Sequence, residues 1–269
     1  MRSILLHIAD DACLEARLQV ALDLARSMDG HVTCVQATPY EFVVPGDFYG
    51  TGAAEIVVSM GKAADALRQR LEARLAGEDV AWWWQQESGP AEERLVARSG
   101  LSDVIVIGCC DPVSRSSSKL PGRVVARACA PILLVPPQAT GLDCTGPALV
   151  AWDGSPEASH ALRAATPLLA RAERVILASV EEPREKRSFD LPATEGARYL
   201  SRYGVACDMV EFPAEDRSIA EVLTGAAAAH DAAYLVMGAY GRMRLSEMIW
   251  GGVTRELLAS PPLPIFACH

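Results

Sequence analysis

The residues most able to do chemistry in this chain are the glycines that follow an apolar run near its C-terminal end. Residues 234–237 (Tyr-Leu-Val-Met) lead directly into Gly238-Ala239-Tyr240-Gly241, and Gly251-Gly252-Val253-Thr254 follows nine residues later. Glycine lets the backbone turn sharply and approach a ligand closely, and bare N–H groups at a helix N-terminus favour an anion. This spacing is typical of a phosphate cradle and indicates a nucleotide ligand.

The chain also repeats itself, and the repeat indicates which elements position the glycine loop. Each half begins with an apolar strand followed by an amphipathic helix, and each ends with a proline and another apolar strand. The matching segments are 4–8 with 148–152, 104–108 with 235–238, and 131–135 with 264–267. The repeat therefore indicates two copies of one unit of roughly 135 residues, each of ordinary domain size. We expect domains at 1–138 and 146–269, joined by a linker rich in Pro, Gly and Thr.

Strands alternate with helices throughout both halves. Apolar residues recur at helical spacing over 14–25, with Gly30 as the expected stop, and Ser155-Pro156-Glu157 has the composition of a helix start. Such alternation predicts an α/β fold with a parallel sheet and right-handed crossovers. In sheets of this kind a ligand lies beyond the carboxyl ends of the strands, at the point where the strand order reverses.

Composition excludes several classes of protein. Half of the residues are hydrophobic, the formal net charge is −9, and basic residues form no block, which argues against nucleic acid as a main partner. No apolar run is long enough to span a bilayer, and the first residues lack the ordered regions of a signal peptide. We therefore expect a cytoplasmic protein with no membrane partner.

Cysteine and histidine offer no metal motif by spacing. The eight cysteines include no C-x-x-C pair, so neither a zinc site nor a redox dithiol is predicted, and most are interpreted as small core residues. Vicinal Cys109 and Cys110, at the end of a strand, are a candidate oxidation site, although no group in the sequence visibly lowers the pKa of either thiol. The five histidines have no metal spacing.

The second half resembles a known family. Val150-Ala151-Trp152-Asp153-Gly154-Ser155 at its start, Gly-x-x-Gly-x9-Gly near its end and a closing Pro-apolar strand are similar to the universal stress proteins, and the two halves together resemble the tandem type. The resemblance implies two Rossmann-like (adenine nucleotide alpha-hydrolase-like) domains, each a five-stranded parallel sheet with helices on both faces. It also implies a role in the stress response and an adenine nucleotide as ligand.

Site residues follow from the resemblance position by position. Asp153 matches the residue that contacts the nucleoside. The adenine and ribose pocket is matched by Ala151, Val180 and Met237, and the phosphate loop by Gly238, Gly241, Gly251, Gly252 and Val253. Arg242 follows Gly241 and is a further candidate for phosphate contact. Gly252 replaces the family's usual Ser or Thr, so a hydroxyl donor is missing, and Thr254 is a candidate replacement.

The first half departs further from the family pattern. Ala9 stands where the family has its Asp, and Asp111 replaces the second glycine of the loop, where a negative charge would repel phosphate. The loop is also shorter and carries serines and one lysine in place of the paired glycines. We therefore expect at most one nucleotide per chain, bound by the second half.

The residues define no catalytic constellation. The chain contains no Walker loop, no pyrophosphatase loop and no ordered Ser-His-Asp or Cys-His set. The leading hypothesis is thus a module that binds ATP, ADP or AMP, with or without Mg²⁺, and acts on an unknown protein partner. The alternatives are a nucleotide-free interaction scaffold and, third, a slow ATPase. The resemblance implies association through the last strand of the sheet, and the two halves can satisfy one such edge within the chain. Because an uncovered apolar strand at a sheet edge tends to find a partner, residues 264–267 predict a homodimer.

Overall fold

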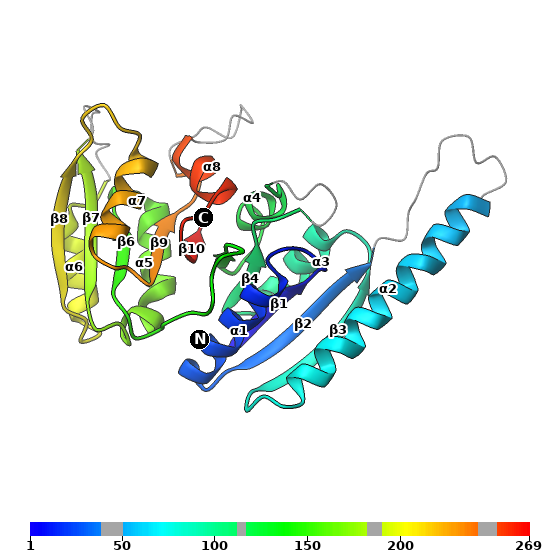
Figure 1. The fold of residues 1–269 in the computed structure, drawn as a ribbon. Helices are drawn as coiled ribbons and strands as arrows, with labels where there is room; N and C mark the ends of the chain where they lie inside the picture. Colours follow the sequence, from blue (N-terminus) through cyan, green and yellow to red (C-terminus); the bar gives the residue numbers. More distant parts are fainter. Residues whose placement is uncertain (39–50, 112–116, 182–189, 242–251) are drawn as a thin grey trace.

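The computed structural model describes residues 1–38, 51–111, 117–181, 190–241 and 252–269. Over these residues the strands form one ten-stranded sheet in the order β3-β2-β1-β4-β5-β10-β9-β6-β7-β8 (Figure 1). No helix among the described residues is both long enough and apolar enough to cross a membrane.

The elements alternate between strand and helix in each half. The N-terminal half contains β1 (Ser3–Ile8), α1 (Leu14–Met28), β2 (His31–Thr38), α2 (Thr51–Leu75), β3 (Ala81–Ser88), α3 (Ala91–Arg98), the 3-10 turn η1 (Ser99–Leu101), β4 (Val104–Gly108), α4 (Leu120–Val125) and β5 (Ile132–Val135). The C-terminal half contains β6 (Ala148–Ala151), α5 (Pro156–Leu169), β7 (Val175–Glu181), α6 (Ala193–Ser201), β8 (Cys207–Pro213), α7 (Ile219–Ala229), β9 (Tyr234–Gly238), α8 (Gly252–Ala259) and β10 (Ile265–Cys268).

Both halves have the same topology. The strand order 3-2-1-4-5 of the first half matches the order 8-7-6-9-10 of the second, and every pairing within a half is parallel. The predicted fold, two Rossmann-like units with five parallel strands each, is confirmed. The two sheets join where β5 and β10 pair antiparallel, through Ile132, Leu133 and Leu134 opposite Ala267, Phe266 and Ile265.

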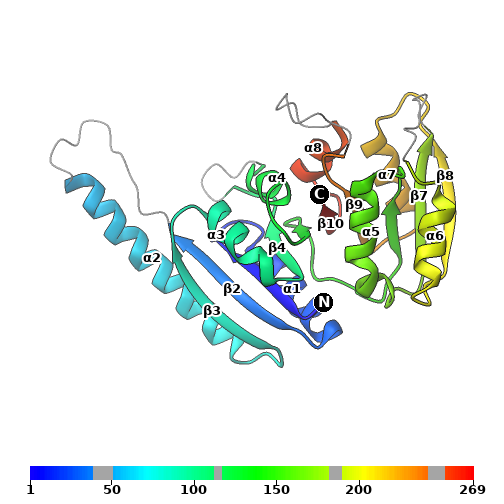
Figure 2. The ribbon, with the colours of Figure 1, turned by 180° about the vertical axis from the view of Figure 1, so that it is seen from behind.

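Helices cover both faces of this sheet because its inner strands are apolar on both sides. Successive side chains of a strand point to opposite faces. Ile4 and Leu6 belong to the buried cluster that also contains residues of α1, α2, α5 and α6, whereas Leu5 belongs to the cluster that contains residues of α3, α4, α7 and α8. Figures 1 and 2 show these two helical layers from opposite sides. Equivalent helices of the two halves therefore lie on the same face.

Local sequence explains where helices begin and end, with one correction. Ser155 caps α5, its side chain accepting a hydrogen bond from the Ala158 N–H at 3.1 Å, and Pro156 occupies the first helical turn, as predicted. At the end of α1 the left-handed residue is Asp29, with φ 50°, and not the predicted Gly30. Asp tolerates this conformation better than most residues with a side chain, so the helix ends one residue earlier than a glycine signal suggests.

The linker packs against the first domain. Leu142 and Cys144 are buried in the core beneath α1, and the Leu142 N–H donates to the Asp23 carboxylate at 3.0 Å. This contact ties the connection between the halves to the N-terminal unit. The domain bounds 1–138 and 146–269 themselves stay a prediction.

The edge argument for a homodimer is wrong in its premise. Strand β10 is flanked by β9 on one side and by β5 on the other, so residues 264–267 present no free edge. The outer strands of the sheet are β3 and β8. On β3 successive side chains alternate between faces, because Trp84 is buried and Trp83 is 61% exposed. Homodimerisation stays an untested prediction.

A buried histidine on β1 should make stability depend on pH. Burial, with a contribution from the charge of Arg17, lowers the pKa of His7 to about 3. Because the unfolded chain would bind this proton near pH 6.5 and the folded chain would not, stability is full above that pH and falls as the solution becomes more acidic. Between pH 7.5 and 5, the free energy of unfolding of the parent should therefore fall by about 2 kcal/mol more than that of His7→Gln.

Denaturant unfolding at both pH values checks this. The matched control is His31→Gln, at an exposed histidine on the neighbouring strand. An equal pH dependence in the parent and His7→Gln would contradict the assignment.

Candidate functional site

A cavity of about 1210 Å³ opens at the carboxyl ends of the C-terminal strands. The strand order reverses here, because β6 lies between β7 and β9, whose crossover helices cover opposite faces of the sheet. The starts of α5 and α8 also reach the cavity, through Ser155 and Glu157 and through Gly252 and Thr254. Its position is the one that parallel α/β sheets use for ligands.

The structure brings nearly all of the predicted site residues to this cavity. The lining includes Ala151, Asp153, Val180, Met237, Gly238, Gly241, Gly252, Val253 and Thr254. Arg242 and Gly251 lie outside the described residues. The nucleotide-binding roles given to these residues stay predictions, but their convergence from β6, β7, β9 and α8 does not depend on those roles.

Asp153 stands at a tightly fixed corner between β6 and α5. Its Oδ1 accepts a hydrogen bond from the Ser155 N–H at 3.0 Å, while the residue as a whole is exposed to the cavity. Between them Gly154 has φ +78°, and its carbonyl accepts from the Leu191 N–H at 2.9 Å. The Trp152 indole Nε1–H donates to the Leu191 carbonyl at 3.1 Å. Asp153 thus shapes the turn and also lines the cavity.

One of the loop glycines is required by packing alone. A Cβ at Gly238 would lie 2.6 Å from the backbone nitrogen of Ala158, so the end of β9 runs directly over the first turn of α5. A Cβ at Gly241 would lie 2.5 Å from Oε2 of Glu157, the end of a flexible side chain that can move away, so packing does not require this glycine. Sequence reasoning assigned both glycines to a ligand, but close backbone approach already accounts for Gly238.

Gly252 differs from these glycines. A Cβ built there meets no atom of the described residues within 4 Å, so the described part of the chain leaves space beside the first residue of α8. Nearby, the buried Thr254 hydroxyl accepts a hydrogen bond from the Tyr240 N–H at 3.4 Å. This hydroxyl is the one predicted to replace the missing donor at Gly252, and its own proton is not used in that contact.

Tyr240 connects this loop to the other half of the chain. It has φ 63°, and its hydroxyl donates to the Gly122 carbonyl of α4 at 3.1 Å. Burial raises the pKa of Tyr240 to about 12, so the phenol stays protonated and remains a donor. Its ring also lies edge-on to His269, with centroids 6.2 Å apart. No local sequence pattern indicates this contact, because it joins residues more than a hundred positions apart.

The described lining is acidic. It contains six carboxylates and no lysine, arginine or histidine among the described residues: Asp153, Glu157, Glu181, Asp190, Glu211 and Glu215. Oε2 of Glu157 is buried and has no hydrogen-bond partner among the described residues. Sequence reasoning identified Glu157 only as part of a helix start, although its place in the first turn of α5 could have indicated its position in the site.

The equivalent place in the N-terminal half is filled differently. Matching β1 to β6 through their pairings with β4 and β9 puts Ala9 at the position of Asp153 and Cys13 at that of Glu157. A Cβ at Gly108 would lie 2.5 Å from the Cys13 Cβ and 2.7 Å from Arg17 Nη1. Side chains therefore occupy the space next to the end of β4.

An ion pair and a thiol cluster dominate this filled region. The guanidinium of Arg17, which is fully buried, donates to Asp11 at 2.7 Å and also to the Ala9 carbonyl. A hydrogen bond from Cys109 lowers the pKa of Cys13 to about 6, and that same contact, together with burial, raises the pKa of Cys109. The sequence predicted the loss of the acid at Ala9, but not this replacement.

Comparison with known proteins places the C-terminal half in a family. Residues 146–269 match the model of the universal stress protein family. This half of the chain is a universal stress protein domain. A search of curated proteins found no match.

Solved structures extend the likeness in fold to the whole chain. A universal stress protein from Archaeoglobus fulgidus has a TM-score of 0.75 at 14% identity, covering 98% of this chain and 97% of that one. A protein of unknown function from Pseudomonas aeruginosa PAO1 has a TM-score of 0.58 at 18% identity, covering 100% and 92%. The tandem arrangement therefore occurs in other chains, and the N-terminal half shares the fold of the universal stress proteins.

Two glycines with the same backbone conformation provide a stability test of the corner. Gly154 has φ +78° and a Cβ there would lie 2.3 Å from the Leu191 carbonyl oxygen, whereas Gly204 has φ +75° and open space around it. Gly204→Ala should cost about 1 kcal/mol for the left-handed conformation alone. Gly154→Ala should cost about 3 kcal/mol or more, because the clash adds to the same strain.

Chemical unfolding of the two variants measures the difference. Equal losses would show that the backbone around Leu191 is free to move away, and that the corner at Asp153 is not rigid.

Proposed function

We propose that the C-terminal domain binds one adenine nucleotide per chain, with ATP as the leading candidate, and acts as a binding and regulatory module. The observation that carries this proposal is the cavity of about 1210 Å³ at the carboxyl ends of β6, β7 and β9, lined by residues that match the family's nucleotide site. A cytoplasmic location and a role in the stress response belong to the same proposal, as does a protein partner that reads the bound state.

The lining residues would hold the nucleoside at one end of the cavity and the phosphates at the other. Asp153 is exposed and would accept hydrogen bonds from ribose hydroxyls, while the apolar side chains of Val180 and Met237 would contact the base. At the other end, the backbone N–H groups at the start of α8 would face the phosphates, where the helix dipole favours negative charge. The open space at Gly252 leaves room for them.

The acidic lining constrains the form of the nucleotide. Six carboxylates around a triphosphate would repel it unless a cation offsets the charge. Mg²⁺ binds through carboxylates together with phosphate oxygens, and the buried, unpartnered Oε2 of Glu157 offers an acceptor near the glycine loop. We therefore propose that the nucleotide binds as its Mg²⁺ complex.

The same acidity favours the second candidate, a nucleotide-free interaction scaffold. An acidic cavity without a described basic residue also suits a positively charged segment of a partner protein. The two candidates predict opposite responses to nucleotide, so binding measurements separate them.

Titration calorimetry of the full-length protein with ATP tests the main proposal. We expect one site per chain in the presence of Mg²⁺ and weaker binding when EDTA removes the metal, because the lining carboxylates then face an uncompensated triphosphate. Two equivalent sites would contradict the assignment to the C-terminal domain. The absence of binding with and without Mg²⁺ would favour the scaffold.

Substitutions at Gly252 test the phosphate end of the cavity without disturbing the fold, since added atoms there meet open space. Gly252→Ser adds a hydroxyl donor and should tighten ATP binding about fivefold, the equivalent of about 1 kcal/mol. Gly252→Asp adds a like charge and should weaken binding by about tenfold or more. Gly252→Ala is the matched control and should change affinity little. If all three variants bind ATP equally, the phosphates lie elsewhere.

A further inference from the structure

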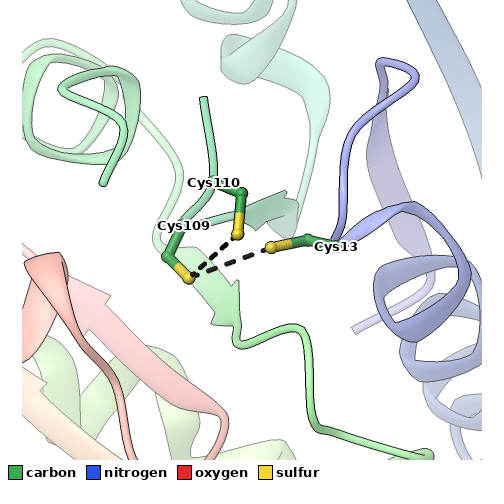
Figure 3. A group of neighbouring side chains, drawn as sticks. All are labelled: Cys13, Cys109 and Cys110. Carbon is green, nitrogen blue, oxygen red and sulfur yellow. Dashed lines mark hydrogen bonds between the residues drawn. The ribbon is translucent and has the colours of Figure 1, made fainter. Parts of the chain in front are cut away.

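Three cysteines that are far apart in the sequence meet at the carboxyl end of the N-terminal sheet. Cys13 precedes α1, and Cys109 and Cys110 follow β4 (Figure 3). The sulfur of Cys109 lies 3.8 Å from that of Cys13 and 4.0 Å from that of Cys110, and all three sulfurs lie within 4.8 Å of one another. Figure 3 shows the three thiols pointing toward a common centre. Sequence spacing concealed this group, because no two of its members form a C-x-x-C pair.

The backbone around the cluster is fixed from several directions. The Cys13 N–H donates to Asp11 Oδ1 at 2.8 Å, and Asp11 is in turn held by the buried Arg17. On the other strand, the Cys109 carbonyl accepts from the Ser118 N–H at 2.7 Å, and Cys110 forms a bridge with Ser117. The thiols are therefore held in place by their neighbours and not by one another alone.

The sulfur separations fit a single metal ion. Three thiolates bound at about 2.3 Å to one ion in tetrahedral geometry lie about 3.8 Å apart. The Cys13–Cys109 and Cys109–Cys110 sulfur separations, 3.8 and 4.0 Å, are already close to this value. Thiolate sulfur is a soft ligand that selects Zn²⁺ or Cu⁺ over hard cations. Ordinary core packing explains a buried thiol, but it does not require three sulfurs to converge.

One side of the cluster is open. A cavity of about 210 Å³ is lined by Cys109 and Cys110 together with Ser117 and residues of the linker and of the segment before β10. Cys13 is fully buried behind them, whereas Cys110 is half-buried. The cavity gives an ion a path of entry. It also leaves room for a water molecule as the fourth ligand that zinc requires beyond three protein ligands.

We propose that Cys13, Cys109 and Cys110 form a three-thiolate binding site for a thiophilic d10 metal ion, Zn²⁺ or Cu⁺. As the ion binds, each thiol that becomes a ligand releases its proton to solvent, and no electron is transferred. Cu⁺ is satisfied by three sulfurs, whereas Zn²⁺ would add a water from the cavity. The site is independent of the nucleotide site, since it lies in the other half of the chain.

The test titrates the reduced, full-length protein under anaerobic conditions with each metal separately, against a chromophoric competitor. We expect one high-affinity equivalent of Zn²⁺ or of Cu⁺ per chain, and X-ray absorption of the loaded protein should count three sulfur neighbours. Cys110→Ser is the main variant because Cys110 is half-buried and its loss leaves the core intact. It should weaken binding by about 100-fold or more, since losing a ligand should exceed the 10- to 100-fold effect of an outer partner.

Matched controls keep the number of cysteines equal. Cys129→Ser, at an exposed position, and Cys207→Ser, at a half-buried one, remove thiols outside the cluster and should leave affinity unchanged. Cys109→Ala should abolish the site, and circular dichroism of that variant shows whether it still folds. The proposal is overturned if neither metal binds, if Cys110→Ser binds as tightly as the controls, or if the absorption spectrum counts fewer than three sulfurs.

Discussion

The pairing of β5 with β10 is the constraint on which the rest of the architecture depends. Three buried residue pairs, from Ile132 with Ala267 to Leu134 with Ile265, turn two five-stranded sheets into one. Because the pairing is antiparallel, the carboxyl ends of the two halves point in opposite directions at the junction. The end of β4 therefore borders the segment that leads into β10, where Cys109 shares a small cavity with Pro261. The junction buries an edge strand of each half.

A common scaffold carries different chemistry at one equivalent position. Glu157 and Cys13 occupy equivalent positions in the two halves, shortly after β6 and β1. Glu157 lies against Gly238 at the end of β9, and Cys13 lies against Gly108 at the end of β4. In the C-terminal half the space above remains open as a large cavity. In the N-terminal half a buried Arg17 and three thiols take that place. The first half is thus altered in a specific way and is more than a degenerate copy.

The fold could be predicted from the sequence because its signals are local. Strand and helix periodicity and the Ser155-Pro156 helix start lie within short windows, and the internal repeat is visible because the same short segments recur in both halves; the structure bears these signals out. The cavity lining could be predicted in part for the same reason, since most of the residues named for it sit at strand ends. Contacts between distant residues left no such signal. The Tyr240 hydroxyl on Gly122 depends on how the two halves pack, and the meeting of Cys13 with Cys109 depends on how two distant segments of one half come together.

Glycine spacing, which first indicated a phosphate site, turns out to be weaker evidence than it looks. Gly238 is required by the close approach of β9 to α5, with or without a ligand. Gly252 is different, because nothing in the described protein prevents a side chain there. Packing within the protein does not require glycine at this position, yet the chain has glycine there. Contact with a bound ligand can explain why a side chain is absent. The nucleotide proposal therefore rests more on Gly252 and the exposed carboxylate of Asp153 than on the glycines that drew attention to the loop.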